Sequence, residues 1–145
     1  MSSTSSRSDE PFATGARLVD LPRIMDARGN LTFVESSQHV PFAIRRAYWI
    51  YGVPGGESRG GHGYRRLEEF FIALSGSFRV TIDDGAKTDE VVLNRSYFGL
   101  YVPTLRWRRL DDFSTNAVCL ILASLPFSED DYVRDREAFL AEARP

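Results

Sequence analysis

The sequence is poor in cysteine, lysine and histidine, and it contains no long hydrophobic run. Because Cys119 is the only cysteine, no intrachain disulfide can form, and its position inside the apolar stretch 117–123 predicts a buried thiol in a reducing compartment. No apolar stretch approaches the roughly 20 residues that a membrane-spanning helix needs. The first residues also lack the apolar core of a signal peptide. We therefore expect a cytoplasmic protein with no membrane partner.

Positive charge is carried almost entirely by arginine, since Lys87 is the only lysine. The formal net charge is −2, and the arginines are interleaved with acidic residues, so no basic stripe is available for a nucleic acid. Genome composition is one explanation for the arginines. Their bidentate geometry toward phosphate and carboxylate is another.

Length and composition predict one globular domain. A chain of 145 residues that is 43% hydrophobic and 26% charged can bury a substantial core. Residues 1–14 are rich in serine and poor in apolar side chains, so we expect a disordered N-terminal tail there. The single domain should then occupy residues 15–145.

Short strand-like segments separated by turn residues predict an all-β fold. In segment 43–51 the side chains alternate, so that Arg46 and Tyr48 share one face. Only residues 129–142 look helical, with Ser128 as the N-cap and acidic residues in the first turn. We expect a closed or sandwiched antiparallel sheet with one C-terminal helix and a ligand site at its mouth. The expected strands are residues 17–21, 31–35, 43–51, 70–74, 77–82, 90–93, 97–102 and 117–123, with a hairpin turn at 83–85.

The segment 56–76, GESRGGHGYRRLEEFFIALSG, gathers the polar groups best suited to catalysis. Gly60 and Gly61 allow a ligand to approach the backbone closely. His62 and Tyr64 are two residues apart, so in a strand their side chains point to the same face. Glu69 would follow on the next pass of the sheet. A histidine, a phenol and a carboxylate converging on one cavity would be a site for moving protons.

The spacing of Gly56, His62, Glu69 and Gly76 resembles the first sequence motif of the cupin superfamily. This resemblance implies a cupin jelly-roll β-barrel. Tyr64 stands where the motif has a second histidine, and a neutral phenol is a poor ligand for a divalent metal. The segment 99–109, GLYVPTLRWRR, where the second cupin motif supplies another histidine, has none. We therefore expect no metal site and no cofactor.

A series of short motifs follows in a fixed order along the chain: DARGNL (26–31), VPF (40–42), RRAY (45–48), RGGH (59–62), LSGSF (74–78), DDG (83–85), GLYVP (99–103), WR (107–108), DFS (112–114) and DYVR (131–134). This series narrows the resemblance to the dTDP-4-keto-6-deoxyglucose 3,4-ketoisomerases, the WxcM-like sugar ketoisomerases. The resemblance implies a metal-independent homodimer that binds a dTDP-linked 4-keto-6-deoxy sugar. It also implies that proton transfer yields a 3-keto-6-deoxy sugar nucleotide for amino- and deoxysugar biosynthesis.

The family resemblance implies catalytic roles for His62, Tyr64 and Tyr48. His62 matches the first catalytic histidine and would be the general base, with an ordinary pKa near 6.5. Tyr64 takes the place of the second histidine and would be an acid toward an enolate oxygen. Tyr48 matches a family tyrosine, and it either orients His62, bonds to the sugar or packs in the core. Glu69, which we place among the substrate-binding residues, is either a buried partner for an arginine or an orienting acceptor for His62.

Further substrate-binding residues follow from the same resemblance. Arg28, Arg46 and Arg59 match family positions around the pocket and would hold the pyrophosphate through bidentate contacts. Trp107 and Arg108 would also lie at the pocket, with the indole against the base or sugar and the guanidinium near the reacting carbons.

Two questions stay open at the level of sequence. Asn30, together with Arg108, matches positions that bear on the configuration at C4 of the product, which leaves axial and equatorial products both possible. With Tyr64 in place of the second histidine, three functions stay open: a 3,4-ketoisomerase, an epimerase acting beside the same carbonyl, or a sugar-nucleotide-binding cupin of little activity. In each case we expect a homodimer, because exposed edge strands are commonly covered by dimerisation, with segment 18–21 crossing to the neighbour.

Overall fold

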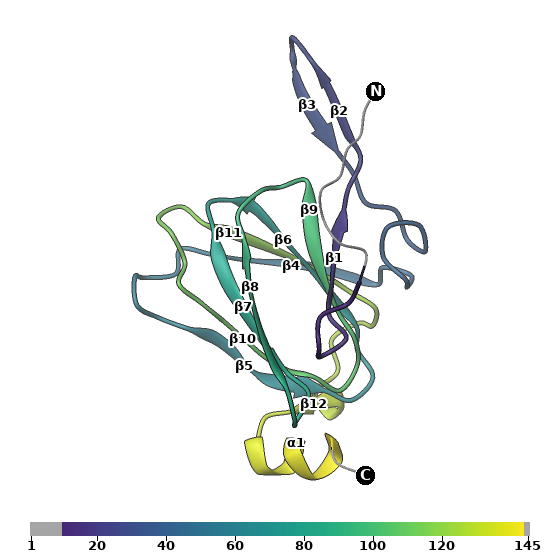
Figure 1. Ribbon diagram of the computed structural model, residues 1–145, viewed down its shortest axis with the longest axis vertical. Coiled ribbons are helices and arrows are strands. Elements are labelled where there is room, and N and C mark those ends of the chain that lie inside the picture. Colours follow the sequence, from purple (N-terminus) through teal and green to yellow (C-terminus); the bar gives the residue numbers. More distant parts are fainter. Residues whose placement is uncertain (1–9, 144–145) are drawn as a thin grey trace.

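Two antiparallel five-stranded sheets lie face to face in the computed structural model, which describes residues 10–143 (Figure 1). The chain passes from one sheet to the other between β4, β5, β6 and β7, and again between β8, β9, β10 and β11. This alternation confirms the predicted jelly roll. The first sheet has the order β1 (Arg17–Asp20), β9 (Phe98–Val102), β6 (Glu69–Ser75), β11 (Val118–Ala123) and β4 (Arg46–Tyr51). The second has the order β12 (Tyr132–Val133), β5 (Arg59–Tyr64), β10 (Trp107–Asp111), β7 (Phe78–Asp83) and β8 (Thr88–Leu93).

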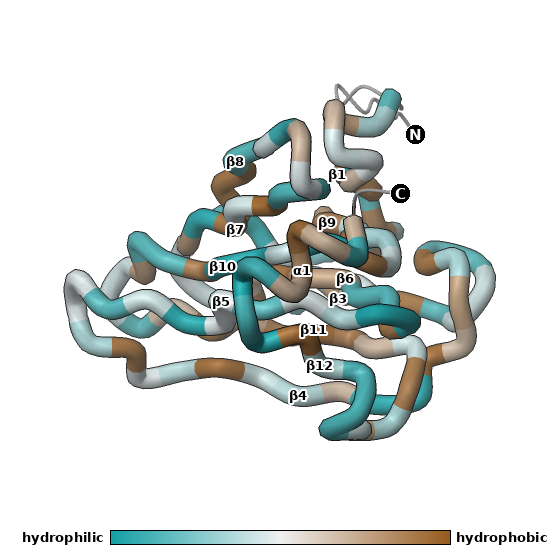
Figure 2. The backbone as a smooth tube through the Cα atoms, turned by 90° about the horizontal axis from the view of Figure 1, so that it is seen from below, coloured by the Kyte–Doolittle hydropathy of each residue, from teal (hydrophilic) through white to brown (hydrophobic). Residues whose placement is uncertain are grey.

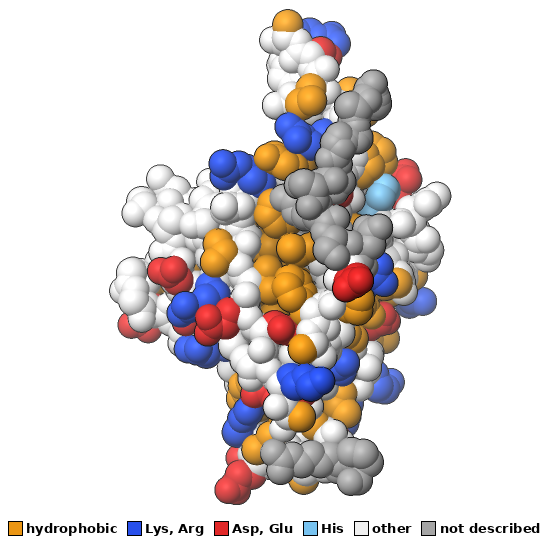
Figure 3. All heavy atoms as spheres, viewed as in Figure 1, with side chains coloured by type: hydrophobic (Ala, Val, Ile, Leu, Met, Phe, Trp, Pro, Cys, Tyr) orange, Lys and Arg blue, Asp and Glu red, His pale blue; other side chains and the backbone are white. Residues whose placement is uncertain are grey.

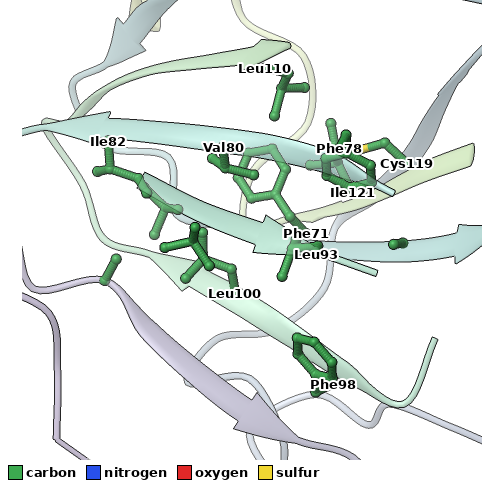
Figure 4. Close-up of a cluster of buried hydrophobic side chains, with 14 residues drawn as sticks. Phe71, Phe78, Val80, Ile82, Leu93, Phe98, Leu100, Leu110, Cys119 and Ile121 are labelled. Carbon is green, nitrogen blue, oxygen red and sulfur yellow. The ribbon is translucent and has the colours of Figure 1, made fainter. Parts of the chain in front are cut away.

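Alternating side chains build the core between the sheets. In β7, Phe78, Val80 and Ile82 are buried while the residues between them are partly exposed. Figure 2 shows the matching change between hydrophobic and hydrophilic residues along the strands. Phe71 and Ile121 of the first sheet meet the β7 side chains in one cluster (Figure 4). Cys119 belongs to this cluster and is fully buried, as the sequence predicted.

A separate hairpin projects from one end of the body, opposite the end that carries the C-terminal helix (Figure 1). It consists of β2 (Arg23–Asp26) and β3 (Gly29–Thr32), which pair with each other in a two-stranded sheet of their own. The predicted strand at 31–35 is therefore displaced toward the N-terminus. The predicted turn at 83–85 is confirmed, because it joins the paired strands β7 and β8.

The expected tail at residues 1–14 overlaps the described residues only at 10–14. There the expectation is wrong, because Thr14 is 1% exposed and its backbone N–H and hydroxyl both donate to Asp89. These two bonds, at 2.9 and 2.6 Å, tie the segment to β8. Residues 1–9 lie outside the described part of the chain.

The predicted helix at 129–142 is also corrected. The segment begins as a short 3-10 turn, η1 (Glu129–Asp131), continues as β12, and becomes helical only in α1 (Arg136–Ala143). Asp131 does not lie on a solvated face but is 3% exposed and accepts the backbone N–H groups of Arg66 and Leu67. The Asp135 carboxylate, and not Ser128, caps α1 by accepting the N–H of Ala138. No helix in the described chain is long and apolar enough to cross a membrane.

Candidate active site

His62 and Tyr64 lie side by side on β5, as their spacing predicted. The imidazole Nε2 and the phenol oxygen are 3.0 Å apart, which is hydrogen-bonding distance. β5 carries three glycines, so its conformation depends on its neighbours β10 and β12. In the register with β10, His62 lies opposite Arg108, which places both side chains on the same face of the sheet.

Arg108 and Glu69 form a buried ion pair between the two sheets. Nε of Arg108 donates to Oε1 of Glu69 at 2.9 Å, Nη2 donates to Oε2 at 3.0 Å, and each side chain is 3% exposed. The Tyr48 hydroxyl donates to Glu69 Oε2 at 2.7 Å and accepts from Arg108 Nη2 at 3.1 Å. The carbonyl of Gly60 accepts from Nη1 at 3.2 Å. Such a satisfied network is stable, although removing one partner would leave a buried charge.

This network decides between the two interpretations of Glu69. Its carboxylate is the buried partner of Arg108 and is not an acceptor for His62. Glu69 and Arg108 face each other and each side chain is 3% exposed, and their contact with substrate stays a prediction. They fix Tyr48 beside the site.

Burial and nearby cations set the protonation state of the site. Burial, followed by the positive charges of Arg108 and Arg134, lowers the pKa of His62 from 6.5 to about 3. The imidazole is therefore a neutral base across the physiological range, and its pKa lies well below the value expected from sequence. Burial and then the Glu69 carboxylate raise the pKa of both Tyr64 and Tyr48 above the ordinary phenol value, so both phenols are neutral. A neutral base beside neutral proton donors can move a proton.

The C-terminal segment completes the site, and the sequence analysis missed it. Tyr132 of β12 pairs with Tyr64, and its ring lies 4.6 Å from that of Tyr64 and 5.0 Å from the imidazole of His62. The Arg134 guanidinium stacks on Tyr132 at 4.1 Å and is paired with Glu129. The motif DYVR is visible in the sequence, but the acidic run that overlaps its start is also typical of the first turn of a helix.

The remaining expected site residues lie either beside this network or at exposed positions away from it. Arg46 lies near the network, with its guanidinium 4.4 Å from the centre of the Tyr48 ring. Arg59 is exposed at the start of β5. Arg28 and Asn30 are exposed at the β2–β3 hairpin, which projects from the body at the end away from β5, the strand that carries His62 (Figure 1).

Trp107 does not point into the same space as Arg108. Neighbouring residues of a strand face opposite sides, and the indole packs 5.6 Å from Phe139 of α1, with Arg136 over its ring. Trp107 thus packs between β10 and α1, and its contact with the base or sugar stays a prediction.

Among residues 10–143, no three histidine, cysteine, aspartate or glutamate side chains gather in a way that could hold a metal ion. The polar groups around His62 are instead phenols and guanidinium groups, which suit proton transfer and anion binding. Fold and site together define a cupin-type jelly roll that holds a cluster of imidazole, phenol and guanidinium groups between its sheets.

The comparisons with known proteins agree with a cupin-type jelly roll. The family model described as "FdtA: WxcM-like, C-terminal" matches residues 14–144. The chain belongs to this family, as its motifs predicted, and it is an isomerase. A curated relative from Aneurinibacillus thermoaerophilus, TDP-4-oxo-6-deoxy-alpha-D-glucose-3,4-oxoisomerase, is 37% identical over 85% of this chain and 88% of its own length.

Two solved structures show the same architecture. A 3,4-ketoisomerase from Helicobacter canadensis is 32% identical, with a TM-score of 0.87 over 90% of this chain and 98% of that one. The sugar 3,4-ketoisomerase QdtA from Thermoanaerobacterium thermosaccharolyticum, in complex with TDP, is 32% identical, with a TM-score of 0.89 over 92% of this chain and 97% of that one.

Proposed function

We propose that this protein converts a TDP-linked 4-keto-6-deoxy-hexose into its 3-keto isomer, for amino- and deoxysugar biosynthesis. The observation that carries the assignment is the 3.0 Å contact between the neutral imidazole of His62 and the neutral phenol of Tyr64. Its relatives support the substrate class, because one is named for a TDP-4-oxo sugar and a second was solved with TDP.

The reaction moves two protons and leaves the atom count unchanged. His62 takes the proton from C3, and the electron pair of that bond forms a C3–C4 double bond while the C4 carbonyl oxygen gains a proton from Tyr64. The resulting enediol then loses the proton of its C3 oxygen to Tyr64, the C3 carbonyl forms, and imidazolium returns a proton to C4. The substrate's own carbonyl acidifies the C3–H bond, so side chains can perform every step without a cofactor.

Tyr48 is suited to hold the phenol of Tyr64 in place. The two hydroxyl groups interact, and the Tyr48 hydroxyl is fixed by Glu69 and Arg108. Two hydrogen-bonded pairs, His62 with Tyr64 and Tyr48 with Glu69, therefore lie side by side at the site. We assign Tyr64 the role that the second histidine has in the family motif.

The protein is further proposed to act as a homodimer. A groove of about 590 Å³ lies against the outer face of the first sheet and is lined by Ile72, Leu74, Leu120 and residues of the β2–β3 hairpin, including Asn30. Large apolar side chains are exposed beside it, among them Leu31 and Trp49. Figure 3 shows hydrophobic side chains on the hairpin and in a patch that runs down the middle of the body below it. A second copy of the chain would cover this surface and bring the Arg28–Asn30 hairpin toward a neighbouring site.

The test is to incubate the protein with TDP-4-keto-6-deoxyglucose in deuterated water and to follow the sugar protons by NMR. A 3-keto product with deuterium at C4 is expected from the wild type, and His62→Asn should abolish it. Deuterium at C3 or C5 with the 4-keto group retained would instead identify an epimerase. Absence of any exchange in a protein that still binds TDP would leave only the sugar-nucleotide-binding alternative.

A further inference from the structure

Gly63 lies between the two members of the proposed catalytic pair, and a ring from the C-terminal helix packs against it. His62 and Tyr64 point to one face of β5, so a side chain at Gly63 would point to the other. A Cβ atom on Gly63 would lie 3.2 Å from Cδ1 and 3.4 Å from Cε1 of Phe139 in α1, and 2.9 Å from the carbonyl oxygen of Arg106. The Phe139 ring therefore occupies the space behind the backbone that joins His62 to Tyr64.

Packing fixes Phe139 in this position. Its side chain is fully buried, and its ring lies 5.6 Å from that of Trp107, the residue of β10 that pairs with Gly63. On the other side of β5, Gly63 pairs with Val133 of β12, which is also buried. Gly63 is thus enclosed by a strand on each side and by Phe139 over one face.

Contacts at both ends hold α1 against the second sheet. At its first residue, the Arg136 guanidinium pairs with Asp83 at the end of β7. At its last residue, Ala143 lies so close to the β7–β8 turn that a Cβ atom on Gly85 would come within 3.0 Å of it. Because α1 has only eight residues, these tertiary contacts and not its intrinsic helix stability keep Phe139 in place.

The backbone at Gly63 needs such support, because a residue without a side chain has a wide range of φ and ψ. A small rotation there would change the angle between the two neighbouring side chains. The distance from Nε2 of His62 to the hydroxyl oxygen of Tyr64, which is 3.0 Å, would change with it. Proton transfer depends steeply on this geometry, and a misplacement of about 1 Å can cost about a hundredfold in rate.

We infer that Phe139 is a positioning residue for the reaction, which acts through the backbone of Gly63 to hold His62 and Tyr64 at hydrogen-bonding distance. Its effect on the rate rests on the proposed function. The ring lies on the face of β5 opposite the imidazole, so Phe139 does not touch the reacting atoms and transfers no proton. Shortening this side chain should therefore lower kcat and leave the affinity for TDP unchanged.

The test compares Phe139→Leu with Phe78→Leu, because both phenylalanines are almost completely buried. Phe78 is at the start of β7, away from Ile82, which pairs with Arg108. Both variants should lose thermal stability, but only Phe139→Leu should lower kcat, by about tenfold, since a shift well under 1 Å is expected. If Phe139→Leu does not fold, Phe139→Met replaces it in each comparison.

A double-mutant cycle separates positioning from a general loss of structure. In a Tyr64→Phe background, Phe139→Leu should lower kcat no further, because the contact that it disturbs is already absent. A purely structural role would give the same fractional loss of kcat in both backgrounds. Calorimetric titration with TDP should show equal affinity for the wild type and Phe139→Leu.

The ring nitrogen signals of His62 in NMR report the same contact without turnover. They are assigned with His39→Gln, since the chain has two histidines. Phe139→Leu should shift the Nε2 signal of His62, and Phe78→Leu should not. Unchanged kcat and Nε2 signals in Phe139→Leu would overturn the inference, as would equal losses in the two backgrounds of the cycle. If the wild type forms no 3-keto product and Phe139→Leu still shifts the Nε2 signal, the proposed reaction fails and the positioning of the pair stands.

Discussion

Arg108 lies so close to Gly60 that a Cβ atom on Gly60 would collide with its guanidinium. Gly60 also has a φ of +74°, in the left-handed region that glycine tolerates best. The buried position of the Arg108 guanidinium therefore requires a glycine at position 60 of β5. The group that approaches Gly60 in this structure is Arg108, and the approach of a ligand there stays a prediction.

Gly60→Ala should destabilise the protein by about 2–4 kcal/mol, since it adds backbone strain and displaces a buried guanidinium. Urea denaturation measures the change. The matched control is Gly61→Ala, where an added Cβ would approach only Trp107, at 4.0 Å. Similar midpoints for the two variants would contradict the prediction.

Glu69→Gln should cost about 3–5 kcal/mol of folding free energy, because it leaves the charge of Arg108 buried without its partner. Glu129→Gln breaks an equally short pair with Arg134 at the surface and should cost less than about 1 kcal/mol. Chemical denaturation of both variants tests the comparison. Equal losses would mean that burial does not determine the strength of the Arg108 pair.

The pH dependence should reflect the lowered pKa of His62. Between pH 6.5 and about 3, the unfolded chain binds a proton at this position and the folded chain does not. Stability should therefore fall as pH falls through this window, and His62→Asn should reduce that slope. Activity, measured as kcat/KM, should show no loss near pH 6.5, because the folded base is still neutral there. A fall in kcat/KM centred near 6.5 would show that the imidazole has its ordinary pKa.

Tyr64→Phe should lower kcat by at least about a hundredfold, the usual contribution of one general acid, without changing TDP affinity. The ring packing against His62 and Tyr132 is retained, so the loss isolates the hydroxyl. Tyr64→His restores the histidine of the family motif and should retain activity. A Tyr64→Phe enzyme with normal kcat would remove Tyr64 from the proposed mechanism.

Leu74→Arg should shift a homodimer toward monomer, since Leu74 lines the apolar groove and is 50% exposed. Light scattering after size-exclusion chromatography measures the mass. Val92→Arg is the matched control, because Val92 is 55% exposed on β8 of the other sheet. A wild type that is monomeric at micromolar concentration would contradict the proposed assembly.

Local sequence patterns are sufficient for the fold class and for the pair at the centre of the site. Side chains two residues apart on a strand share a face, and this rule alone places His62 beside Tyr64. The same rule shows that Trp107 and Arg108 cannot face the same space. That signal is present in the sequence, although the family resemblance favours placing both residues at the pocket.

The partners of these residues were decided by tertiary structure. Glu69 and Arg108 are 39 residues apart and lie in different sheets, so their pairing depends on how the sheets stack. Tyr132 reaches His62 only because β12 adds to the edge of β5, and a two-residue strand has too few residues to show a period in sequence. The sequence by itself determined which faces the side chains take, because that follows from backbone geometry within one strand. Which faces meet was determined by contacts between strands far apart in the chain, and local propensity carries no information about those contacts.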